Sequence, residues 1–592
     1  AERILKDASR PTTGVDSALL ADVASTFIDR QGGQTELYQG IHAVYTRAGV
    51  EREGELEIQP GARLQGLRIH KQDGRYADVA AGEKRPVNLP GLEPGDAVEY
   101  VWRRYIDPYG GIPGSLDNRT LFLFQGEDRE YNFSRYVIAH DKDLPVEVCG
   151  NMRGLTTTDE TKGGLRVRSW TARRMPRLAA EPHIADQLEV VPNIRLGLGE
   201  TWADLGSLVK SGLAGMLVPD APLPALADEV RKRAGNGGPD ALARALHAVV
   251  TEKIRPGGAP LAMGVPASVS ASAGEGNRAA VALALAQMLG LDARLVLARP
   301  IEYKGRQLDC PSPGAFGYAL VKIVAGGNER YLDYGEADYP FDAFPARLAG
   351  ADGLEIPLAL DAPATIVAIP RRETGPVEES DADLTLDAEG RVSGVVTTTT
   401  RGALGAVLRR MLREVPVDQR PNVFRQLAGD AFPGASVDDS ELTGLDDPEA
   451  DLRIQLKISG GSWGRRTPTG FALPLVSRPL KLLAEYASLQ QRVSALLIDT
   501  QEQRRDEIRL HYPEGLAPVE SPAPAARGEK FGGYALLVKR QPNTITTVRQ
   551  VNMPPGRIEP ADYPLFRSFA QFVDDAESRE VILAVPSPSL NR

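Results

Sequence analysis

The chain has 592 residues, of which 42% are hydrophobic and 25% charged, and its formal net charge is −10. This composition is typical of a globular protein and excludes a disordered chain, a collagen and a disulfide-rich miniprotein. No stretch approaches the roughly 18 apolar residues of a membrane-spanning helix, and basic residues do not cluster. We therefore expect neither an integral membrane protein nor a nucleic-acid-binding protein.

The two cysteines, Cys149 and Cys310, are too few for a zinc cluster. They could form one disulfide, but spacing alone leaves both the paired and the free state open. No HExxH, P-loop or Rossmann fingerprint is present, so we expect no metal and no cofactor. The chain begins with Ala1 rather than Met and has no recognisable signal peptide, so either a leader was removed or the chain is part of a longer protein.

The first part of the chain is predicted to be a β domain. Residues 1–34 are interpreted as a lead-in with an amphipathic helix from Ser17 to Asp29. From Thr35 the hydrophobic period changes to two, and short alternating segments are separated by turn signals such as Asp73-Gly74. Residues 35–195 are therefore predicted to form a β-sandwich.

The middle of the chain, residues 196–371, is predicted to be an α+β domain. Helices are expected over 201–213, 223–234, 240–254 and 277–289, the last of them closed by Gly290. Strands are expected over 293–298, 319–324 and 330–333. A helix that leads into an antiparallel sheet is typical of the α+β class.

The last part, residues 372–592, is predicted to be a β-sandwich with inserted helices. A polar linker is expected over 372–382, strands from 383 onward, and two helices over 401–414 and 418–430. The predicted fold class is thus a multidomain α+β protein with β domains at both ends.

Three segments resemble known bacterial domain families in this order. Leu89-Pro90-Gly91-Leu92-Glu93-Pro94-Gly95-Asp96, followed by Val98-Glu99-Tyr100, is similar to a signature of DUF3857 domains. Gly274-Glu275-Gly276-Asn277-Arg278 with the apolar helix after it, and Phe316-Gly317-Tyr318-Ala319 followed by Tyr331-Leu332-Asp333, resemble transglutaminase-like proteins. The order implies a DUF3858-like β domain at the end of the chain.

The resemblance also implies where a catalytic triad would lie. A thiolate at a helix N-terminus needs a His as base and an Asp to orient that His. Here Gly276 occupies the Cys position, Tyr318 the His position, and Asp333 keeps the Asp. Because glycine has no nucleophile and a phenol is a poor base at neutral pH, we expect a pseudoenzyme with no catalytic residues. The candidate ligand cleft is formed by Gly276, Asn277, Tyr318 and Asp333.

The resulting functional hypothesis is a non-catalytic binding or scaffold protein of a bacterial cell envelope. Its partners would be other envelope proteins or an extended peptide or glycan, and its location the periplasm or cell surface, with the cytoplasm still open. The first alternative is an active transglutaminase or cysteine peptidase that uses Cys149 or Cys310. In that case His247 would be a further candidate, although a packed mid-helix histidine is the expectation.

A second alternative is a carbohydrate-binding protein in which Trp102 or Trp463 forms an exposed stacking platform. Gly460-Gly461-Ser462-Trp463-Gly464 also matches the G-x-S-x-G pattern of hydrolases. No helical pattern follows it, so a glycine-rich β-turn is expected there. The partner, the process served and the oligomeric state are not predicted.

Overall fold

The computed structural model divides the chain into two compact units. The first contains residues 1–181, 186–205 and 305–315, and the second contains residues 182–185, 206–304 and 316–592. The described residues are 15–80, 86–108, 116, 121–257, 264–335, 338–359, 361–371 and 377–585. The predicted lead-in over residues 1–14 lies outside them.

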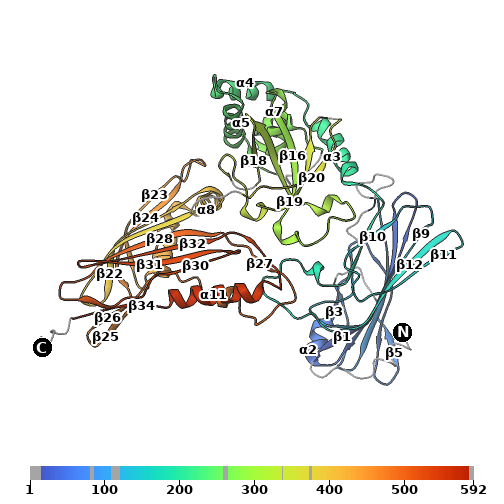
Figure 1. Cartoon of the computed structure of the whole chain (residues 1–592). Coiled ribbons are helices and arrows are strands. Elements are labelled where there is room, and N and C mark those ends of the chain that lie inside the picture. Colours follow the sequence, from blue (N-terminus) through green and yellow to red (C-terminus); the bar gives the residue numbers. More distant parts are fainter. Residues whose placement is uncertain are drawn as a thin grey trace. The chain divides into compact units, whose positions relative to one another are not determined.

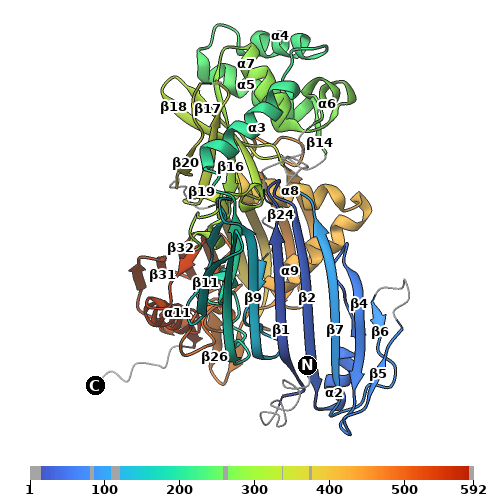
Figure 2. The same ribbon diagram turned by 90° about the vertical axis from the view of Figure 1, so that its right-hand side faces the viewer.

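The first unit is built on an eight-stranded sheet with the strand order β11-β12-β9-β1-β2-β7-β4-β5 (Figure 2). Its strands are β1 (Ser17–Ile28), β2 (Gln34–Val44), β4 (Arg63–His70), β5 (Tyr76–Asp78), β7 (Ala97–Ile106), β9 (Glu130–Asp141), β11 (Thr156–Lys162) and β12 (Leu165–Met175). A short helix, α2 (Arg47–Glu53), follows β2, and β3 (Glu55–Leu56) pairs with β6 (Val87–Asn88).

The predicted helix from Ser17 to Asp29 is wrong, because residues 17–28 form strand β1 in the middle of this sheet. β1 pairs antiparallel with β2 and parallel with β9. The first six residues of β1, 17–22, are all buried, so this half of the strand does not show the alternation of a strand with one exposed face. The apolar residues of this segment were interpreted as one face of a helix. Residues 17–34 therefore belong to the first sheet and not to a lead-in.

A second, smaller layer covers part of the first sheet. It has three strands, β8 (Leu121–Leu123), β10 (Glu147–Cys149) and β13 (Asn193–Gly197), in the order β10-β13-β8. Phe122, Ile194 and Leu196 of this layer share a buried apolar cluster with Tyr136 and Trp170 of the large sheet. Burial between two layers is the source of stability that a β-sandwich uses.

The central domain has helices on a five-stranded antiparallel sheet with the order β18-β17-β16-β19-β20. Its strands are β16 (Asp292–Arg299), β17 (Tyr318–Ala325), β18 (Asn328–Asp333), β19 (Asp352–Pro357) and β20 (Thr365–Ala368). Its helices are α3 (Trp202–Met216), α4 (Leu223–Ala234), α5 (Pro239–Lys253), α6 (Ala267–Ala273) and α7 (Arg278–Met288). The patterns predicted most of these elements but not α6, β19 and β20.

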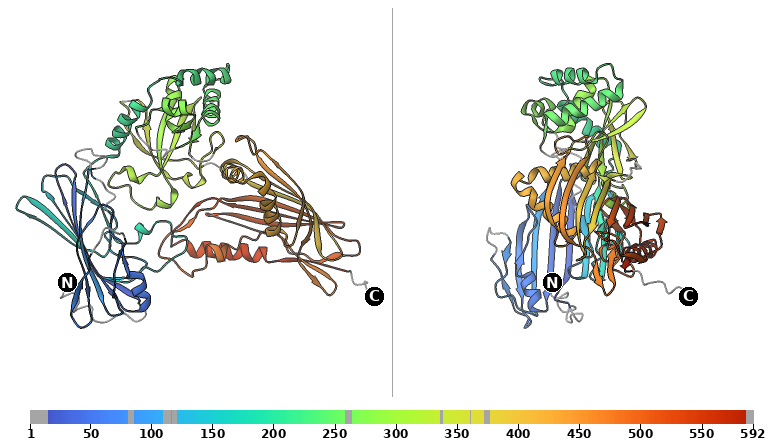
Figure 3. Two further views of the ribbon diagram at one scale, coloured as in Figure 1. Left: turned by 180° about the vertical axis from the view of Figure 1, so that it is seen from behind. Right: turned by 90° about the vertical axis from the view of Figure 1, so that its left-hand side faces the viewer.

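The last part of the chain forms a second eight-stranded sheet, ordered β23-β24-β22-β21-β28-β32-β31-β30 (Figure 3). Its strands are β21 (Glu378–Leu386), β22 (Arg391–Thr400), β23 (Ser436–Thr443), β24 (Leu452–Ser462), β28 (Glu502–His511), β30 (Ala525–Glu529), β31 (Gly532–Gln541) and β32 (Thr544–Met553). The predicted linker over 372–382 is shorter than expected, because β21 begins at Glu378, and residues 372–376 lie outside the described part.

A four-stranded sheet and helices accompany this second large sheet. The smaller sheet is β25-β26-β34-β29, made of β25 (Arg465–Thr467), β26 (Gly470–Pro474), β29 (Ala517–Glu520) and β34 (Glu580–Ala584). β27 (Leu496–Ile498) pairs with β33 (Gly556–Ile558). The helices are α8 (Gly402–Glu414), α9 (Arg420–Ala431), α10 (Leu482–Glu485) and α11 (Tyr563–Glu577). The two inserted helices were predicted, whereas α11, which lies alongside β30 and β31 (Figure 1), was predicted as strand.

Candidate functional site

The predicted cleft begins where α7 starts. Gly274, in the left-handed conformation, closes α6, and the chain then forms the short strand β15 (Glu275–Gly276) beside β14 (Arg255–Pro256). Asn277 is the N-cap of α7, because its side-chain oxygen accepts a hydrogen bond from the backbone N–H of Ala280 at 3.1 Å. This residue, predicted to line a ligand cleft, thus has a structural role in starting the helix.

Gly276 occupies a position that a side chain could hardly enter. Its φ is +141°, a conformation that L-residues rarely adopt. A Cβ atom placed there would lie 2.5 Å from Oγ and 2.9 Å from Cβ of Ser270. Ser270 Oγ instead accepts a hydrogen bond from the backbone N–H of Asn277 at 3.2 Å. The space that a nucleophile would need at the start of α7 is filled by Ser270.

Tyr318 and Asp333 lie on neighbouring strands. Leu320 of β17 is directly opposite Asp333 of β18, so Tyr318, two residues earlier, is its diagonal neighbour on the same face. The guanidinium of Arg347 lies 4.7 Å from the centre of the half-buried Tyr318 ring. The sheet thus brings the base and acid positions of the predicted triad close together. The atoms nearest to position 276 belong to Ser270 and not to this pair.

Asp333 is a buried carboxyl group, 5% exposed. Its Oδ1 accepts a hydrogen bond from the backbone N–H of Gly335 at 2.6 Å. Burial raises the pKa of Asp333 to about 6, and the Gly335 hydrogen bond lowers it only in part. Asp333 is thus a buried carboxyl group whose charged form is disfavoured by its surroundings.

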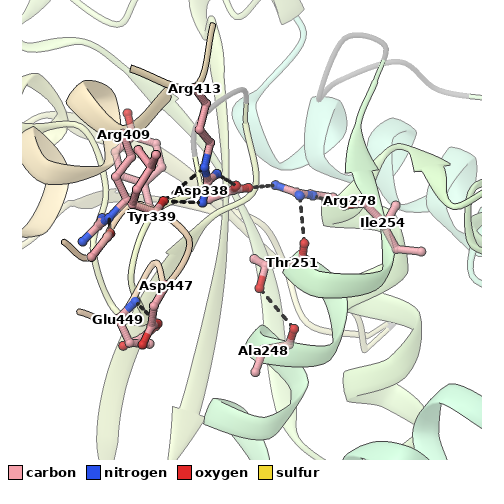
Figure 4. A network of polar contacts seen from close by, with 12 residues as sticks. Ala248, Thr251, Ile254, Arg278, Asp338, Tyr339, Arg409, Arg413, Asp447 and Glu449 are labelled. Atoms are coloured by element: carbon pink, nitrogen blue, oxygen red, sulfur yellow. Dashed lines mark hydrogen bonds and ion pairs between the residues drawn. The ribbon is translucent and has the colours of Figure 1, made fainter. Parts of the chain in front are cut away.

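The segment after Asp333 is held by an ion network that the sequence patterns did not reveal (Figure 4). The buried Arg278 guanidinium donates to the backbone oxygens of Thr251 and Ile254 at the end of α5 and pairs with Asp338 at 2.8 Å. Asp338 also pairs with Arg413 of α8 at 2.8 Å. Burial opposes ionisation, but the two guanidinium groups keep the pKa of Asp338 below its usual value.

Further contacts hold the same segment. His247, buried in α5, contacts the backbone oxygen of Tyr339 through Nε2 at 2.9 Å, and burial lowers its pKa. Glu449 accepts a hydrogen bond from the backbone N–H of Phe341 at 2.7 Å. His247 is therefore a packed histidine, as expected. The one signal that sequence offered was Arg278 itself, a single charge in an otherwise apolar helix.

The two cysteines form a disulfide, Cys149–Cys310, with both residues in the first unit. Because the sequence contains only these two cysteines, neither supplies a free thiol in this structure. Cys310 lies in the segment 305–315, which interrupts the central domain in sequence. In the same segment, Asp309 pairs with Arg195 at 2.7 Å.

The two tryptophans considered as stacking platforms are both buried. Trp102 stacks on Tyr38 with ring centres 5.0 Å apart, and Trp463 packs against Phe432 at 5.3 Å. The G-x-S-x-G segment is the end of β24 and is followed by the strand β25. It is therefore mostly strand and not the expected β-turn, and because no helix follows it, it is not a strand-to-helix nucleophile elbow.

The described residues contain no group of three or more His, Cys, Asp or Glu side chains placed to hold a metal ion. None of their helices is both long enough and apolar enough to cross a membrane.

One family model matches part of this chain, and solved structures resemble all or part of it. Residues 472–583 match the family described as a Domain of Unknown Function with a solved structure, DUF3858, within the predicted last domain. A candidate protease from Parabacteroides distasonis is 11% identical, with a TM-score of 0.59 over 96% of this chain and 99% of the other. At this identity the likeness shows a common multidomain fold. No curated protein matches the sequence.

Other solved structures resemble only parts of the chain. A candidate cysteine protease from Cytophaga hutchinsonii is 14% identical over 42% of this chain and 83% of its own, with a TM-score of 0.18. An M1 zinc metallopeptidase from Deinococcus radiodurans is 12% identical over 31% and 42% of the two chains, with a TM-score of 0.19. Scores this low support no argument about function. The comparisons thus assign the DUF3858 segment and a shared overall fold.

Proposed function

We propose that this chain is a non-catalytic, transglutaminase-like binding or scaffold protein of a bacterial cell envelope. The observation that carries the proposal is the start of α7. There Gly276 provides no nucleophile, and Ser270 Oγ fills the space that a side chain would need. The neighbours in the comparison are named as candidate proteases, but their names belong to those proteins and do not transfer an active site to this chain.

The disulfide supports both the loss of catalysis and the location. A thiolate nucleophile needs a free sulfur at a helix N-terminus, and Cys149 and Cys310 are bonded to each other. Structural disulfides persist in oxidising compartments such as the periplasm and are rare in the cytosol. We therefore favour the periplasm or cell surface over the cytoplasm.

The ion network around Asp338 favours a segment of fixed conformation over a cleft that opens to a substrate. The segment that follows Asp333 is fixed by Arg278 on one side and by Arg413 and Glu449 on the other. A substrate that approached Asp333 along this segment would have to break these contacts. Fixed geometry of this kind suits a protein that presents surfaces to partners, either folded envelope proteins or an extended peptide or glycan.

The first experiment asks whether the protein has a reactive thiol. The native full-length chain is treated with iodoacetamide at pH 6 and pH 8, with and without prior reduction, and both cysteines are followed by mass spectrometry. We expect labelling only after reduction, and then at the rate of an ordinary thiol. Rapid labelling at pH 6 without reductant would reveal a low-pKa thiolate and would support the peptidase alternative.

The second experiment asks for partners and for residual catalysis. Native co-purification with cross-linking, from the source cells at endogenous level, should give stoichiometric partners. In parallel, amine incorporation into casein and peptide hydrolysis are measured for the wild-type chain and for Asp333→Asn. Turnover that is lost in Asp333→Asn would overturn the non-catalytic assignment. A monomer without partners would count against the scaffold role.

A further inference from the structure

A cavity of about 720 Å³ opens on one face of the first large sheet, whereas the residues of the predicted cleft belong to the second unit. Its lining includes Asp22 of β1, Tyr38 and His42 of β2, and Tyr100 of β7, all of them within the first unit. It lies between two apolar clusters, and the Tyr38 ring packs against both of them. The volume falls in the range of roughly 300–1,000 Å³ that small-molecule sites have.

Polar side chains lie along the floor of this cavity. Asp22 accepts hydrogen bonds from Ser134 Oγ at 2.6 Å and from the Tyr38 hydroxyl at 2.9 Å. The Tyr100 hydroxyl lies 3.1 Å from Nε2 of His42. The rings of Tyr38 and Tyr100 are neighbours, with their centres 5.7 Å apart. Two hydrogen-bonded pairs, Asp22 with Tyr38 and His42 with Tyr100, therefore lie next to each other on three adjacent strands.

His42 is also held by a carboxylate. Nδ1 of His42 lies 2.8 Å from Oε2 of Glu53, and Arg129 pairs with Oε1 of the same group at 2.7 Å. Burial opposes ionisation of Glu53, but His42 and Arg129 lower its pKa to about 2. The same Nδ1 also lies 2.8 Å from Nη1 of Arg129, so this ring nitrogen contacts both a carboxylate and a guanidinium group.

The side chains of the floor differ in how they form hydrogen bonds. The hydroxyls of Tyr38 and Tyr100 can each donate and accept, and a carboxyl group donates as well as accepts when it is protonated. Burial raises the pKa of Asp22 to about 6, so a protonated Asp22 is accessible near neutral pH. The floor therefore offers groups that can each donate or accept.

The guanidinium groups of the cavity are already paired. Arg104 pairs with Glu36 in the wall, and Arg129 pairs with Asp128 as well as with Glu53. A phosphate or carboxylate ligand would have to compete with these carboxylates for the guanidinium groups. Asp22 has hydroxyl partners, and burial disfavours its charged form. The electrostatics of the cavity thus favour an uncharged ligand over an anion.

Aromatic rings provide the rest of the lining. Tyr105 lies at the rim and is 55% exposed, and Tyr131 and Phe122 also line the cavity. Gly40 lets the Tyr100 ring lie across β2, because a Cβ at position 40 would be 2.5 Å from that ring. The faces of these rings can pack against apolar C–H groups of a ligand, and the neighbouring polar groups can form hydrogen bonds with its hydroxyl groups.

From this geometry we propose that the cavity binds a neutral carbohydrate unit, of one or two sugar residues. Hydroxyl groups both donate and accept, so they match a floor of phenol, imidazole and carboxyl groups. The cavity adds a recognition function to the chain that is independent of the predicted cleft. It differs from the stacking platform that the sequence suggested, because Trp102 lies buried under Tyr38 and the exposed ring is Tyr105.

The test measures binding of sugars to the full-length chain with its disulfide intact. A glycan array identifies bound sugars, and isothermal titration calorimetry with N,N′-diacetylchitobiose, cellobiose and maltose gives affinities. Inorganic phosphate and spermidine serve as the charged probes. The variants are Tyr105→Ala and Tyr38→Phe, and the control is Tyr76→Ala, which removes an equally exposed tyrosine (57%) of β5 outside the cavity.

We expect a neutral sugar to bind, Tyr105→Ala and Tyr38→Phe to weaken binding about tenfold or more, and Tyr76→Ala to change it less than twofold. Tyr105→Ala removes a surface ring and should leave the fold intact, which circular dichroism verifies. The proposal fails if no neutral glycan on the array binds, if phosphate or spermidine binds in its place, or if both alanine variants behave alike. None of these outcomes depends on whether the predicted cleft is catalytic.

Discussion

The two large sheets at the ends of the chain have the same topology. Read from one edge, β4-β7-β2-β1-β9-β12-β11 of the first corresponds to β23-β24-β22-β21-β28-β32-β31 of the second. The order of these strands along the chain is the same, and the parallel pair, β1 with β9 or β21 with β28, is at the same place. All other pairs in both sets are antiparallel. The sequence shows no repeat that would have predicted this correspondence.

The sheets differ in what covers them. The second sheet shares one apolar cluster with α9, α11 and the four-stranded sheet, and at its centre Arg549 is 2% exposed. Arg549 pairs with Asp506 at 2.7 Å and with Glu577 of α11 at 2.8 Å. The first sheet has three separate apolar clusters, and the polar cavity lies between two of them. Its buried Asp22 has hydroxyl partners and no cation.

This contrast teaches that the same strand arrangement can serve either as a closed core or as an open site. In the second sheet a helix supplies the counter-charge and the apolar cover. In the first sheet the corresponding polar groups are satisfied by one another and remain open to a ligand. The stability of each sheet can be measured by hydrogen exchange of its individual strands, because a chain of several domains need not unfold in one step.

Arg549→Met should have the largest effect. It leaves Asp506 and Glu577 buried without a cation, and breaking one partner of a buried ion network costs about 3–5 kcal/mol. Amides of β28 and β32 should lose protection, while those of β1 and β2 should not. Arg465→Ala removes a surface pair with Glu580 and is the control, with an expected cost below about 1 kcal/mol. Equal effects of the two variants would mean that the second core does not depend on its ion network.

Reduction of Cys149–Cys310 should destabilise the first unit by about 2–5 kcal/mol, because the bond closes a loop of 161 residues in the unfolded chain. The loss of protection should concentrate in β10 and β13. Cys149→Ser with Cys310→Ser should reproduce the effect without reductant. The second sheet is the internal control, since it contains no cysteine. A uniform loss of protection in both sheets would show that the disulfide stabilises the whole chain.

The first sheet should lose stability as the pH rises. Folded Asp22 keeps its proton up to a pKa of about 6, whereas in the unfolded chain it loses it near pH 4. The folded state thus binds more protons between these values, and the linkage makes stability fall by about 2–3 kcal/mol across them. Asp22→Asn cannot titrate and should flatten this dependence for β1 and β2. Asp333→Asn, which changes a buried carboxyl of the central domain, should leave it unchanged. If Asp22→Asn keeps the wild-type profile, Asp22 is not the group responsible.

The sequence predicted helices better than it predicted the arrangement of the strands. The helices α4, α5, α7, α8 and α9 have clear amphipathic or apolar patterns, and their positions were close. All of them except α8 also have Pro or Asn near the start. The strand β1 was missed because its partners come from both sides and one of them, β9, is about a hundred residues away. Such long-range pairing leaves only a short apolar run in the local sequence.

The helix α11 could have been found. Tyr563, Phe566, Phe569, Ala570 and Val573 repeat at helical spacing, and Pro564 is near the start.

For the candidate site, the sequence predicted individual residues but not the side chains that surround them. Tyr318 and Asp333 were expected to lie in one cleft, and they are neighbours on adjacent strands of the sheet. That Ser270 fills the space at Gly276, and that Arg278 lies inside the domain with Asp338, could not be predicted. Each depends on atoms from segments that no local pattern connects. The same holds for the cavity of the first sheet, whose lining comes from strands that are up to a hundred residues apart.

The smallest predicted effect concerns the helices that only the second sheet carries. Between β2 and β4 the first sheet has the seven-residue α2, whereas between β22 and β23 the second has α8 and α9. Because α8 belongs to this insertion, its Arg413 can pair with Asp338. Because both side chains are partly exposed, their coupling should be only about 0.5–1 kcal/mol. A double-mutant cycle with Arg413→Ala and Asp338→Asn, read from the protection of β17 and β18, measures it. A coupling of zero would mean that Arg278 alone holds the Asp338 carboxylate, and α8 would then serve the second sheet only as cover.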